Sequence, residues 1–377
     1  MSIQLGEILH IQKGKKPLSQ SDTATDGYLP YVDIKAFEQG IIDNYASTEK
    51  SLLCEDGDLL IVCDGSRSGL TGRAIKGVVG STLAKISADG LTTEYLRYFI
   101  QSKYTLLNTQ KKGTGTPHLN AEILKSSTII VPSLPEQDRI VSRIEELFTE
   151  LDKAVETLQT IKKQLAVYRQ AVLKEALLKC EKTLSVKSVC VCVTDGDHQP
   201  PPKTKFGIPF IMITNIDKNA ICWDNTSYVS EDYYNSLSEH RRPRNGDVLY
   251  TVTGSFGIPV LVDFDTKFCF QRHIALLRPN TRILQKFLFY VMQSPDVFIK
   301  ARDKATGTAQ KTVGLTPLRE IQIPFTDSIE NQNDIVVEIE SRLSVCDSIE
   351  KTVGAALSKA EAMCQSILKK AFDGELK

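Results

Sequence analysis

Small, hydroxyl-bearing and basic residues gather in glycine-containing segments, where their chemistry would be hydrogen bonding to nucleic acid. Glycine lets a partner approach the backbone closely, and lysine side chains can contact phosphate groups. Arginine and glutamine can form paired hydrogen bonds with the edges of guanine and adenine. The candidates are Lys111, Lys112, Thr114, Thr116 and His118, then Thr308, Gln310 and Lys311, and also Ser66, Arg67, Thr253, Ser255 and Arg272.

A simpler interpretation of the same residues stays open. The glycines can serve only to make turns, with the basic side chains solvated around them. His198 and Gln199 are a similar case, because they follow a short Asp-Gly-Asp run at residues 195–197. For these two residues, shaping the loop is favoured over contact with a base, and both interpretations are kept.

Motifs for catalysis and for cofactor binding are missing from the sequence. It has no GxxxxGK[ST] phosphate loop, no GxGxxG after an expected strand, and no Asn/Asp-Pro-Pro-aromatic run of the adenine-methyltransferase type. The five histidines form no local motif with a nucleophile, and the nine cysteines include no Cys-x-x-Cys pair. We therefore expect a non-catalytic chain without a metal or cofactor of its own. A nuclease site built from acids far apart in the sequence is the alternative.

The balance of charge limits how the chain can meet nucleic acid. Its 377 residues include 46 lysines and arginines and 46 aspartates and glutamates, so the formal net charge is zero. A protein that holds DNA alone through phosphate contacts is expected to be basic. If this chain binds DNA, we expect other members of a complex to supply much of the positive charge.

Composition also indicates the compartment. A hydrophobic fraction of 41% and a charged fraction of 24% are typical of a folded, soluble protein. The sequence has no long apolar run, and its first residues lack the basic and apolar stretches of a signal peptide. We expect a cytoplasmic protein with reduced thiols and no membrane contact.

The elements that position the candidate residues occur twice. The run GDLL at residues 57–60, followed by Gly65 and Ser66, reappears as GDVL at 246–249, followed by Gly254 and Ser255. In the same way YLRY at 95–98 reappears as FLFY at 287–290. Two copies of one unit predict a pseudo-two-fold molecule, and such a molecule suits a partner with two ends.

Two long helices are the clearest structural prediction. From Ile140 to Val172 the apolar positions step by four and three, which is a heptad seam, and a weaker seam interrupted by Arg342 runs from Ile335 to Ile367. Because the first helix leads away from the first domain and the second begins where the second domain ends, antiparallel packing buries both seams. Each helix would span roughly 60 to 67 Å.

The predicted fold class is therefore α+β, with two similar mixed α/β domains separated by two long antiparallel helices in a coiled coil. The predicted segments are a first domain over 1–135, a first spacer helix over 136–182, a second domain over 183–328 and a second spacer helix over 329–377. Short apolar runs between turn residues predict strands at 59–62, 129–131, 210–213 and 258–262. Helices are predicted at 94–105 and 284–302.

Several runs resemble one known family, the specificity subunits of Type I restriction-modification systems. The run DGDHQPP at 195–201 with GIPFI at 207–211 resembles the opening of a target recognition domain of that family. The run PEQDRIV at 135–141 resembles the start of its spacer helix, and QSILKKAF at 365–372 with GEL at 374–376 resembles its C-terminal helix end. The resemblance covers essentially the whole chain. The departures are KGKKP at 13–17, where the first domain should open, and ENQ at 330–332.

This resemblance implies a function. In that family each recognition domain reads one half of a bipartite DNA sequence, and the helices set the gap between the halves. Two modification subunits dock on the helices and methylate adenine with S-adenosylmethionine, and motor-nuclease restriction subunits use ATP and Mg. The resemblance thus implies double-stranded DNA and both kinds of subunit as partners, with no cofactor in this chain.

Docking residues are predicted near the helix ends. Leu173, Leu177 and Phe372 extend apolar surface beyond the seam, which suggests a surface for the partner subunits. The alternative is that the helices only hold the domains apart. Two other classes of protein are kept open: a coiled-coil adaptor that never reads bases, and a stand-alone DNA enzyme.

Overall fold

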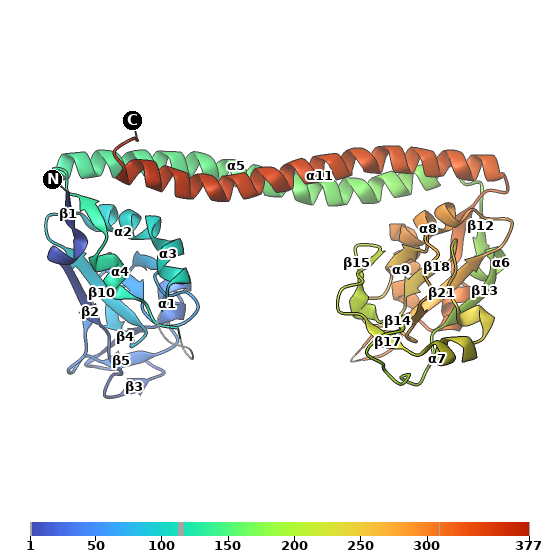
Figure 1. The fold of residues 1–377 in the computed structure, drawn as a ribbon, viewed down its shortest axis with the longest axis horizontal. Coiled ribbons are helices and arrows are strands. Elements are labelled where there is room, and N and C mark those ends of the chain that lie inside the picture. The colour runs from blue at the N-terminus through green and yellow to red at the C-terminus, as the bar shows by residue number, and fades with distance from the viewer. Residues whose placement is uncertain (1, 112–116, 309, 377) are drawn as a thin grey trace. The chain divides into compact units, whose positions relative to one another are not determined.

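The computed structural model describes residues 2–111, 117–308 and 310–376. It contains two compact units: unit 1 comprises residues 1–158 and 354–377, and unit 2 comprises residues 159–353. Each unit holds one mixed domain of strands and short helices together with parts of two long helices, α5 (Leu134–Leu177) and α11 (Ile329–Phe372) (Figure 1). Within the described ranges, no helix is both long enough and apolar enough to cross a membrane.

The main sheet of unit 1 has four antiparallel strands in the order β2-β10-β7-β8. Its side chains alternate between two cores: Leu59 and Ile61 of β7 pack toward α2, whereas Leu60 and Val62 pack toward a second sheet. The second sheet has the order β3-β5-β4-β9-β6. The bounds are β2 (Leu9–Lys13), β10 (Leu83–Ala88), β7 (Leu59–Val62), β8 (Thr71–Arg73), β3 (Gln20–Ser21), β5 (Tyr45–Ser47), β4 (Tyr28–Val32), β9 (Gly77–Val79) and β6 (Leu53–Cys54).

The remaining elements of unit 1 close its core. β1 pairs with β11 beside the start of α5, and the short helices cover the sheets. Their bounds are β1 (Ser2–Gln4), β11 (Thr128–Ile130), η1 (Leu5–Glu7), α1 (Ile34–Gln39), α2 (Thr93–Ser102), α3 (Tyr104–Thr109) and α4 (Ala121–Lys125).

Unit 2 repeats this plan. Its main sheet has the order β13-β21-β18-β19, its second sheet has the order β17-β14-β20, and β12 pairs with β22 as β1 pairs with β11. The strands are β12 (Lys182–Ser185), β13 (Cys190–Asp195), β14 (Ile208–Ile211), β15 (Ile216–Asp217), β16 (Ala220–Ile221), β17 (Ser227–Val229), β18 (Val248–Thr251), β19 (Pro259–Leu261), β20 (Cys269–Phe270), β21 (Ile274–Pro279) and β22 (Gln322–Phe325). The helices are α6 (Val186–Val189), η2 (Ile213–Asn215), α7 (Glu231–Ser236), η3 (Glu239–Arg241), α8 (Gln285–Gln293), α9 (Pro295–Lys304) and α10 (Leu315–Arg319).

The two long helices pack through the predicted seams within each unit. In unit 2, Arg169 of α5 donates hydrogen bonds to Asp347 and Glu350 of α11, and Glu175 accepts one from Arg342. Since the residue numbers rise along one helix as they fall along the other, the two segments are antiparallel. The buried seam members recur every seven residues: Leu165 and Val172 on α5, and Ile339, Cys346 and Val353 on α11. Tyr168 and Ile349 also fall on the steps of four and three that predict the two seams, but both side chains are exposed.

A buried glutamine fixes the start of each long helix to its own domain. In unit 1, Gln137 accepts a hydrogen bond from the Thr92 amide (2.7 Å) and donates to the Gly90 and Pro132 carbonyls (2.7 and 3.1 Å). Both helices therefore begin with the same contact, because Gln332 makes the equivalent set in unit 2. It accepts from the Leu284 amide (2.8 Å) and donates to the carbonyls of Arg282 and Thr326 (both 2.9 Å).

Two predicted helices differ from the structure. The single helix predicted over 284–302 is wrong, because it is divided into α8 and α9 at Ser294 and Pro295. Proline has no N–H to continue α8, and it suits the first turn of α9, which Ser294 caps. The helix predicted over 94–105 is likewise two helices, α2 and α3.

One ion pair in unit 2 is fully enclosed. Arg278 donates from Nε and from a terminal nitrogen to the two oxygens of Asp247 (2.9 and 2.8 Å), and the side chains are 4% and 1% exposed. The hydrogen bonds to Asp247 raise the pKa of Arg278 above its ordinary value, although burial acts in the opposite direction. Arg278 also donates to the Arg242 carbonyl (2.8 Å), so it ties β21 to the loop before β18.

Replacing the buried glutamine tests its role. Gln332→Leu leaves three backbone groups without partners, and we expect the free energy of unfolding of unit 2 to fall by about 2 to 4 kcal/mol. Trp223, the only tryptophan of the chain, lies in unit 2 and reports its unfolding in urea by fluorescence. Gln159→Leu, at an exposed position of α5, is the control and should change stability by less than about 0.5 kcal/mol. Equal midpoints for Gln332→Leu and the unaltered chain would refute this role.

Removing the arginine of the enclosed ion pair should be costly. Arg278→Leu leaves Asp247 buried without a counter-charge, so we expect a loss of about 3 to 5 kcal/mol in the same urea experiment. Lys187→Leu removes the cation of an exposed pair with Glu320 and should cost less than about 1 kcal/mol. A similar small loss for both variants would show that the enclosed pair does not stabilise the unit.

Candidate nucleic-acid interface

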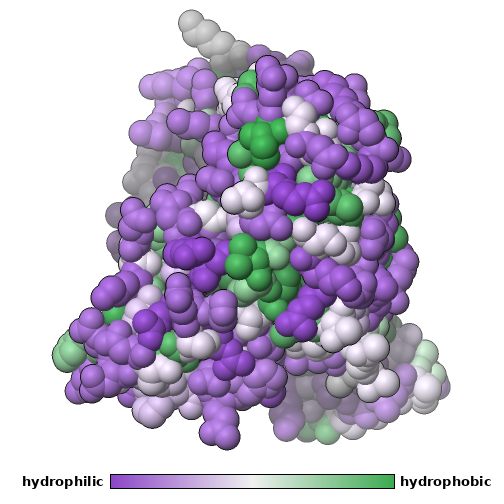
Figure 2. All heavy atoms as spheres, turned by 90° about the vertical axis from the view of Figure 1, so that its right-hand side faces the viewer, coloured by the Kyte–Doolittle hydropathy of each residue, from purple (hydrophilic) through white to green (hydrophobic). Residues whose placement is uncertain are grey.

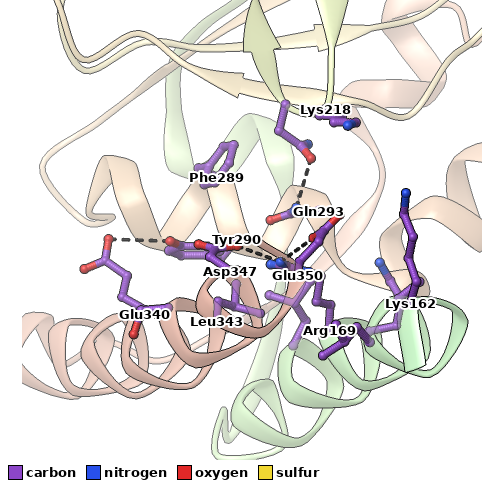
Figure 3. A pocket seen from close by; sticks show the side chains of 16 residues that line it. Lys162, Arg169, Lys218, Phe289, Tyr290, Gln293, Glu340, Leu343, Asp347 and Glu350 are labelled. Atoms are coloured by element: carbon purple, nitrogen blue, oxygen red, sulfur yellow. Dashed lines mark hydrogen bonds and ion pairs between the residues drawn. The ribbon is translucent and has the colours of Figure 1, made fainter. Parts of the chain in front are cut away.

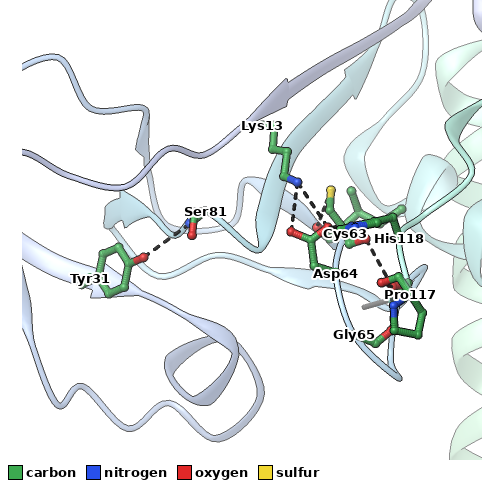
Figure 4. A network of polar contacts seen from close by, with 10 residues as sticks. Lys13, Tyr31, Cys63, Asp64, Gly65, Ser81, Pro117 and His118 are labelled. Carbon is green, nitrogen blue, oxygen red and sulfur yellow. Dashed lines mark hydrogen bonds and ion pairs between the residues drawn. The ribbon is translucent and has the colours of Figure 1, made fainter. Parts of the chain in front are cut away.

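The repeated turns and loops of unit 1 meet at one edge of its main sheet. There β7 ends, and the chain that follows it lies between two other segments. The Gly65 amide donates to the Pro117 carbonyl (2.8 Å), and the Leu119 amide donates to the Cys63 carbonyl (2.7 Å). On the other side, the Cys63 amide donates to the Thr82 carbonyl (2.8 Å), just before β10. The predicted turn and the end of the predicted loop therefore form one surface (Figure 4).

Unit 2 has the same backbone hydrogen bonds at the matching edge. The Gly254 amide donates to the Lys311 carbonyl (3.0 Å), and the Val313 amide donates to the Val252 carbonyl (2.8 Å). The Val252 amide in turn donates to the His273 carbonyl (2.9 Å). These two surfaces lie at the ends of the strands and not along an outer strand, and we call them the sheet edges. They comprise residues 13–14, 63–67, 81–82 and 117–119 in unit 1, and residues 195–196, 252–255, 272–273 and 311–313 in unit 2.

The side chains at the sheet edge of unit 1 form an ionic cluster. Asp64 accepts hydrogen bonds from Lys13 (2.9 and 3.2 Å) and lies 2.7 Å from Nδ1 of His118 (Figure 4). Partial burial acts to raise the pKa of Asp64, but the hydrogen bonds from His118 and Lys13 lower it below the ordinary value. The carboxylate is therefore ionised and partly neutralised, while Lys13 and His118 remain half exposed.

Unit 2 places different side chains at the matching positions. Thr312 and Thr253 form a hydrogen bond between their hydroxyl groups (3.3 Å), where unit 1 has His118 and Asp64. Asp195 ends β13 as Lys13 ends β2, and it lies 3.0 Å from Nε2 of His198. The two sheet edges thus share a backbone frame and differ in chemistry.

The Asp-Gly-Asp-His run of unit 2 is held by a polar network. Arg241 lies 3.8 Å from Asp195 and 3.6 Å from Asp197, and Tyr233 donates its hydroxyl to Asp197 (3.0 Å). Burial, together with this hydrogen bond, raises the pKa of Tyr233, so the hydroxyl keeps its proton. The contact of His198 with Asp195 fits the loop-shaping interpretation, and the role of His198 stays a prediction.

The structure places the other predicted contact residues at or beside these edges. Ser66 and Arg67 are exposed, Arg67 pairs with Glu38, and Lys111 donates to the Ser66 carbonyl (2.6 Å). Thr253 is only 6% exposed, so its hydroxyl serves the contact with Thr312. Lys112, Thr114 and Thr116 lie outside the described residues. Exposed side chains in unit 2 are Gln199, Ser255, Arg272, Thr308, Gln310 and Lys311.

Sequence reasoning missed Lys13, Asp64, Asp195 and Thr312. The signal for two of them was present, because Lys13-Gly14 and Asp195-Gly196 occupy the same place at the end of equivalent strands. Both glycines are required by space: a Cβ on Gly14 would lie 2.2 Å from the Gly80 carbonyl oxygen, and one on Gly196 would lie 2.0 Å from that of Phe270. The departure from the family run in the first domain therefore keeps the glycine and changes the side chain before it.

The predicted docking surface needs correction. Leu173 and Leu177 are 1% and 6% exposed because they pack into the core of unit 2 against α8 and β22. Phe372 packs edge to face on Tyr95 and Phe99 in unit 1, with ring centroids 5.2 and 5.3 Å apart. These side chains attach the helices to their own domains. On the face drawn in Figure 2, hydrophobic side chains form small separate groups among hydrophilic ones.

A groove of about 750 Å³ lies beside the helices in unit 2, and its lining does not have the character of a catalytic site. It lies between α5, α8 and α11, and Arg169 pairs there with two carboxylates (Figure 3). Arg169 donates to Asp347 (2.6 Å) and Glu350 (2.9 Å), and Gln293 donates to Asn219 (3.0 Å). Among the described residues, no group of three His, Cys, Asp or Glu side chains is placed to hold a metal ion.

Comparison with known sequences identifies relatives over most of the chain. The sequence model of the Type I restriction modification DNA specificity domain matches residues 1–165 and 199–358. The chain is 26% identical over 363 residues to the Type I restriction enzyme MjaVIII specificity subunit of Methanocaldococcus jannaschii, covering 90% of this chain and 85% of that protein. It is 25% identical over 391 residues to the Type I restriction enzyme EcoBI specificity subunit of Escherichia coli, covering 95% and 82%.

Comparison with solved structures confirms the fold. A chain from a structural study of complex assembly and conformational transition in the type I R-M system matches with a TM-score of 0.77 and 20% identity, over 100% of this chain and 98% of that chain. The HsdS subunit from Thermoanaerobacter tengcongensis matches with a TM-score of 0.58 and 19% identity, over 100% and 97%. The predicted α+β class with two similar mixed domains and two long helices is confirmed.

Adding a methyl group at Gly196 tests the close approach of the backbone at the sheet edge. In Gly196→Ala the added Cβ would clash with the Phe270 carbonyl oxygen. We therefore expect the segment at 195–198 to shift and the free energy of unfolding to fall by about 1 to 3 kcal/mol. Gly354→Ala, in the interior of α11 with no atom near its Cβ, should raise stability by about 0.5 to 1 kcal/mol. Calorimetry of both variants measures the two shifts, and shifts of the same sign would contradict the steric argument.

Proposed function

The chain belongs to the Type I restriction modification DNA specificity family and is a DNA specificity subunit, and we propose that each of its domains reads one half of a bipartite DNA target. The observation that carries this proposal is the pair of sheet edges. Their backbone hydrogen bonds are the same, whereas their side chains differ. A shared frame supports a shared way of docking on the duplex, and different side chains support different half-sites.

The target is therefore asymmetric. In unit 1 the edge offers one cation, Lys13, and the imidazole of His118 around the carboxylate of Asp64. In unit 2 the equivalent positions carry Asp195 and two threonines, with Arg272 exposed beside them. Cations favour the acceptor-rich edge of guanine, whereas a carboxylate favours the amino group of cytosine. Two identical half-sites would not suit both surfaces.

The two long helices set the gap between the half-sites in this proposal. The number of unread base pairs would follow from the lengths of α5 and α11, since rigid helices fix how far apart two domains can be held. The contacts of the helices with the domains support this role. A buried glutamine fixes the start of each helix. Leu173 and Leu177 fix the C-terminal end of α5, and Phe372 fixes that of α11.

The chemistry belongs to partner subunits in this proposal. Two modification subunits would methylate adenine with S-adenosylmethionine, and restriction subunits would use ATP and Mg to move and cleave unmodified DNA. The zero net charge supports a shared task, because partners would then supply much of the contact with phosphate. An adaptor that never reads bases is not favoured, since the family match covers both domains.

The methylated sites of the genome test the proposal. Deleting this gene from its host, with the modification subunit still expressed, should remove N6-methyladenine from one asymmetric bipartite motif, because no other chain would direct the methylase there. Single-molecule sequencing of the methylome measures the change, and restoring the gene should return the same motif. A methylome that stays unchanged while the methylase is active would favour the adaptor instead.

A further inference from the structure

Arg272 lies in a short segment whose backbone is fixed on both sides. The Gln271 amide donates to the Ile211 carbonyl (3.0 Å), which ties the segment to the second sheet of unit 2. The Val252 amide donates to the His273 carbonyl (2.9 Å), which ties it to the end of β18. A side chain on such a rigid segment is held in position better than one on a long free loop.

Unit 1 has a matching segment with a different residue. The Gly80 amide donates to the Val32 carbonyl (2.9 Å), and the Cys63 amide donates to the Thr82 carbonyl (2.8 Å). Ser81 therefore holds the position that Arg272 holds in unit 2, and its amide lies 3.4 Å from the Tyr31 hydroxyl (Figure 4). The two domains thus offer a natural comparison at a single position of the sheet edge.

The guanidinium of Arg272 is available for a ligand. Its side chain is exposed and, in the part of the chain that the structure describes, makes no ion pair, whereas Arg67 pairs with Glu38. Burial lowers the pKa of His273, and the positive charge of Arg272 lowers it further. The imidazole is therefore neutral and adds no second positive charge beside Arg272. The planar fork of an arginine matches the O6 and N7 acceptors of guanine, which lie on the major-groove edge.

We propose that Arg272 reads a guanine in the half-site of unit 2, and that Ser81 at the matched position leaves the half-site of unit 1 without this contact. The inference rests on the proposed function, because it assumes that the sheet edges face the DNA. It goes further by assigning one base to one residue and by predicting that the assignment can be moved between the two domains.

Two substitutions exchange the matched residues. With Arg272→Ser, one position of one half-site should lose its preference for guanine by roughly 5- to 150-fold, the range that a paired hydrogen bond supplies. With Ser81→Arg, one position of the other half-site should gain a preference for guanine. Arg282→Ser is the matched control. Arg282 is half exposed and lies after the C-terminal end of β21, whereas Arg272 lies before its N-terminal end.

The measurement is a selection from a DNA library randomised in both half-sites, with the full chain in the presence of its modification subunits. Fluorescence of Trp223 checks that unit 2 is folded in Arg272→Ser and Arg282→Ser, and circular dichroism checks the fold of Ser81→Arg, which lies in unit 1. Loss of guanine at one position for Arg272→Ser, with the other half-site unchanged, supports the inference. A uniform loss of affinity for all sequences would mean a phosphate contact and would overturn it.

The experiment separates the inference from the proposed function. If the unaltered chain selects a bipartite motif and Arg272→Ser selects the same one, only the assignment of Arg272 is wrong. If the unaltered chain selects no sequence at all, the proposed function fails, and the inference fails with it. A gain of guanine with Ser81→Arg supports the assignment even where Arg272→Ser proves unstable.

Discussion

Each unit of this chain depends on how a long helix is attached to a small domain, and a buried glutamine makes that attachment. Gln137 and Gln332 each satisfy one amide and two carbonyls where the chain enters α2 or α8 and where the long helix begins. No apolar side chain can replace these contacts without leaving buried backbone groups unpaired. The direction in which each helix leaves its domain is therefore fixed by hydrogen bonds, which are directional, and apolar packing then stabilises it.

Much of the fold could be predicted from the sequence because it depends on periodicity and repetition. The heptad seam was visible, since Leu165 and Val172 recur at the spacing that one helix face requires. A pattern that fits two physical outcomes does not decide between them. Leu173 and Leu177 continue an apolar face, which predicts a surface for a partner as well as it predicts a core. Only the three-dimensional packing shows that their own domain covers them.

The candidate interface was harder to predict because it joins residues that are far apart in the chain. Lys13 and His118 meet at Asp64 only because β2, β10 and β7 are neighbours in that order. Strand order cannot be read from short apolar runs. The internal repeat partly replaces knowledge of the strand order, because the repeated turns at Gly65 and Gly254 mark equivalent places in the two domains.

The two sheet edges suggest how one frame can acquire two specificities. The frame consists of backbone hydrogen bonds, which do not depend on side-chain identity, so the exposed residues can change without loss of the fold. The changes are coupled across the sheet edge, however. The carboxylate of Asp64 and the imidazole of His118 face each other in unit 1, and Thr253 and Thr312 face each other as a hydroxyl pair at the matching bridge of unit 2. Replacing one member alone would leave a half-buried charge or hydroxyl without its partner. Side chains that face each other across the bridge should therefore change in pairs. Arg272 has no such partner in the described structure, so this position can change alone and alter one base preference at a time.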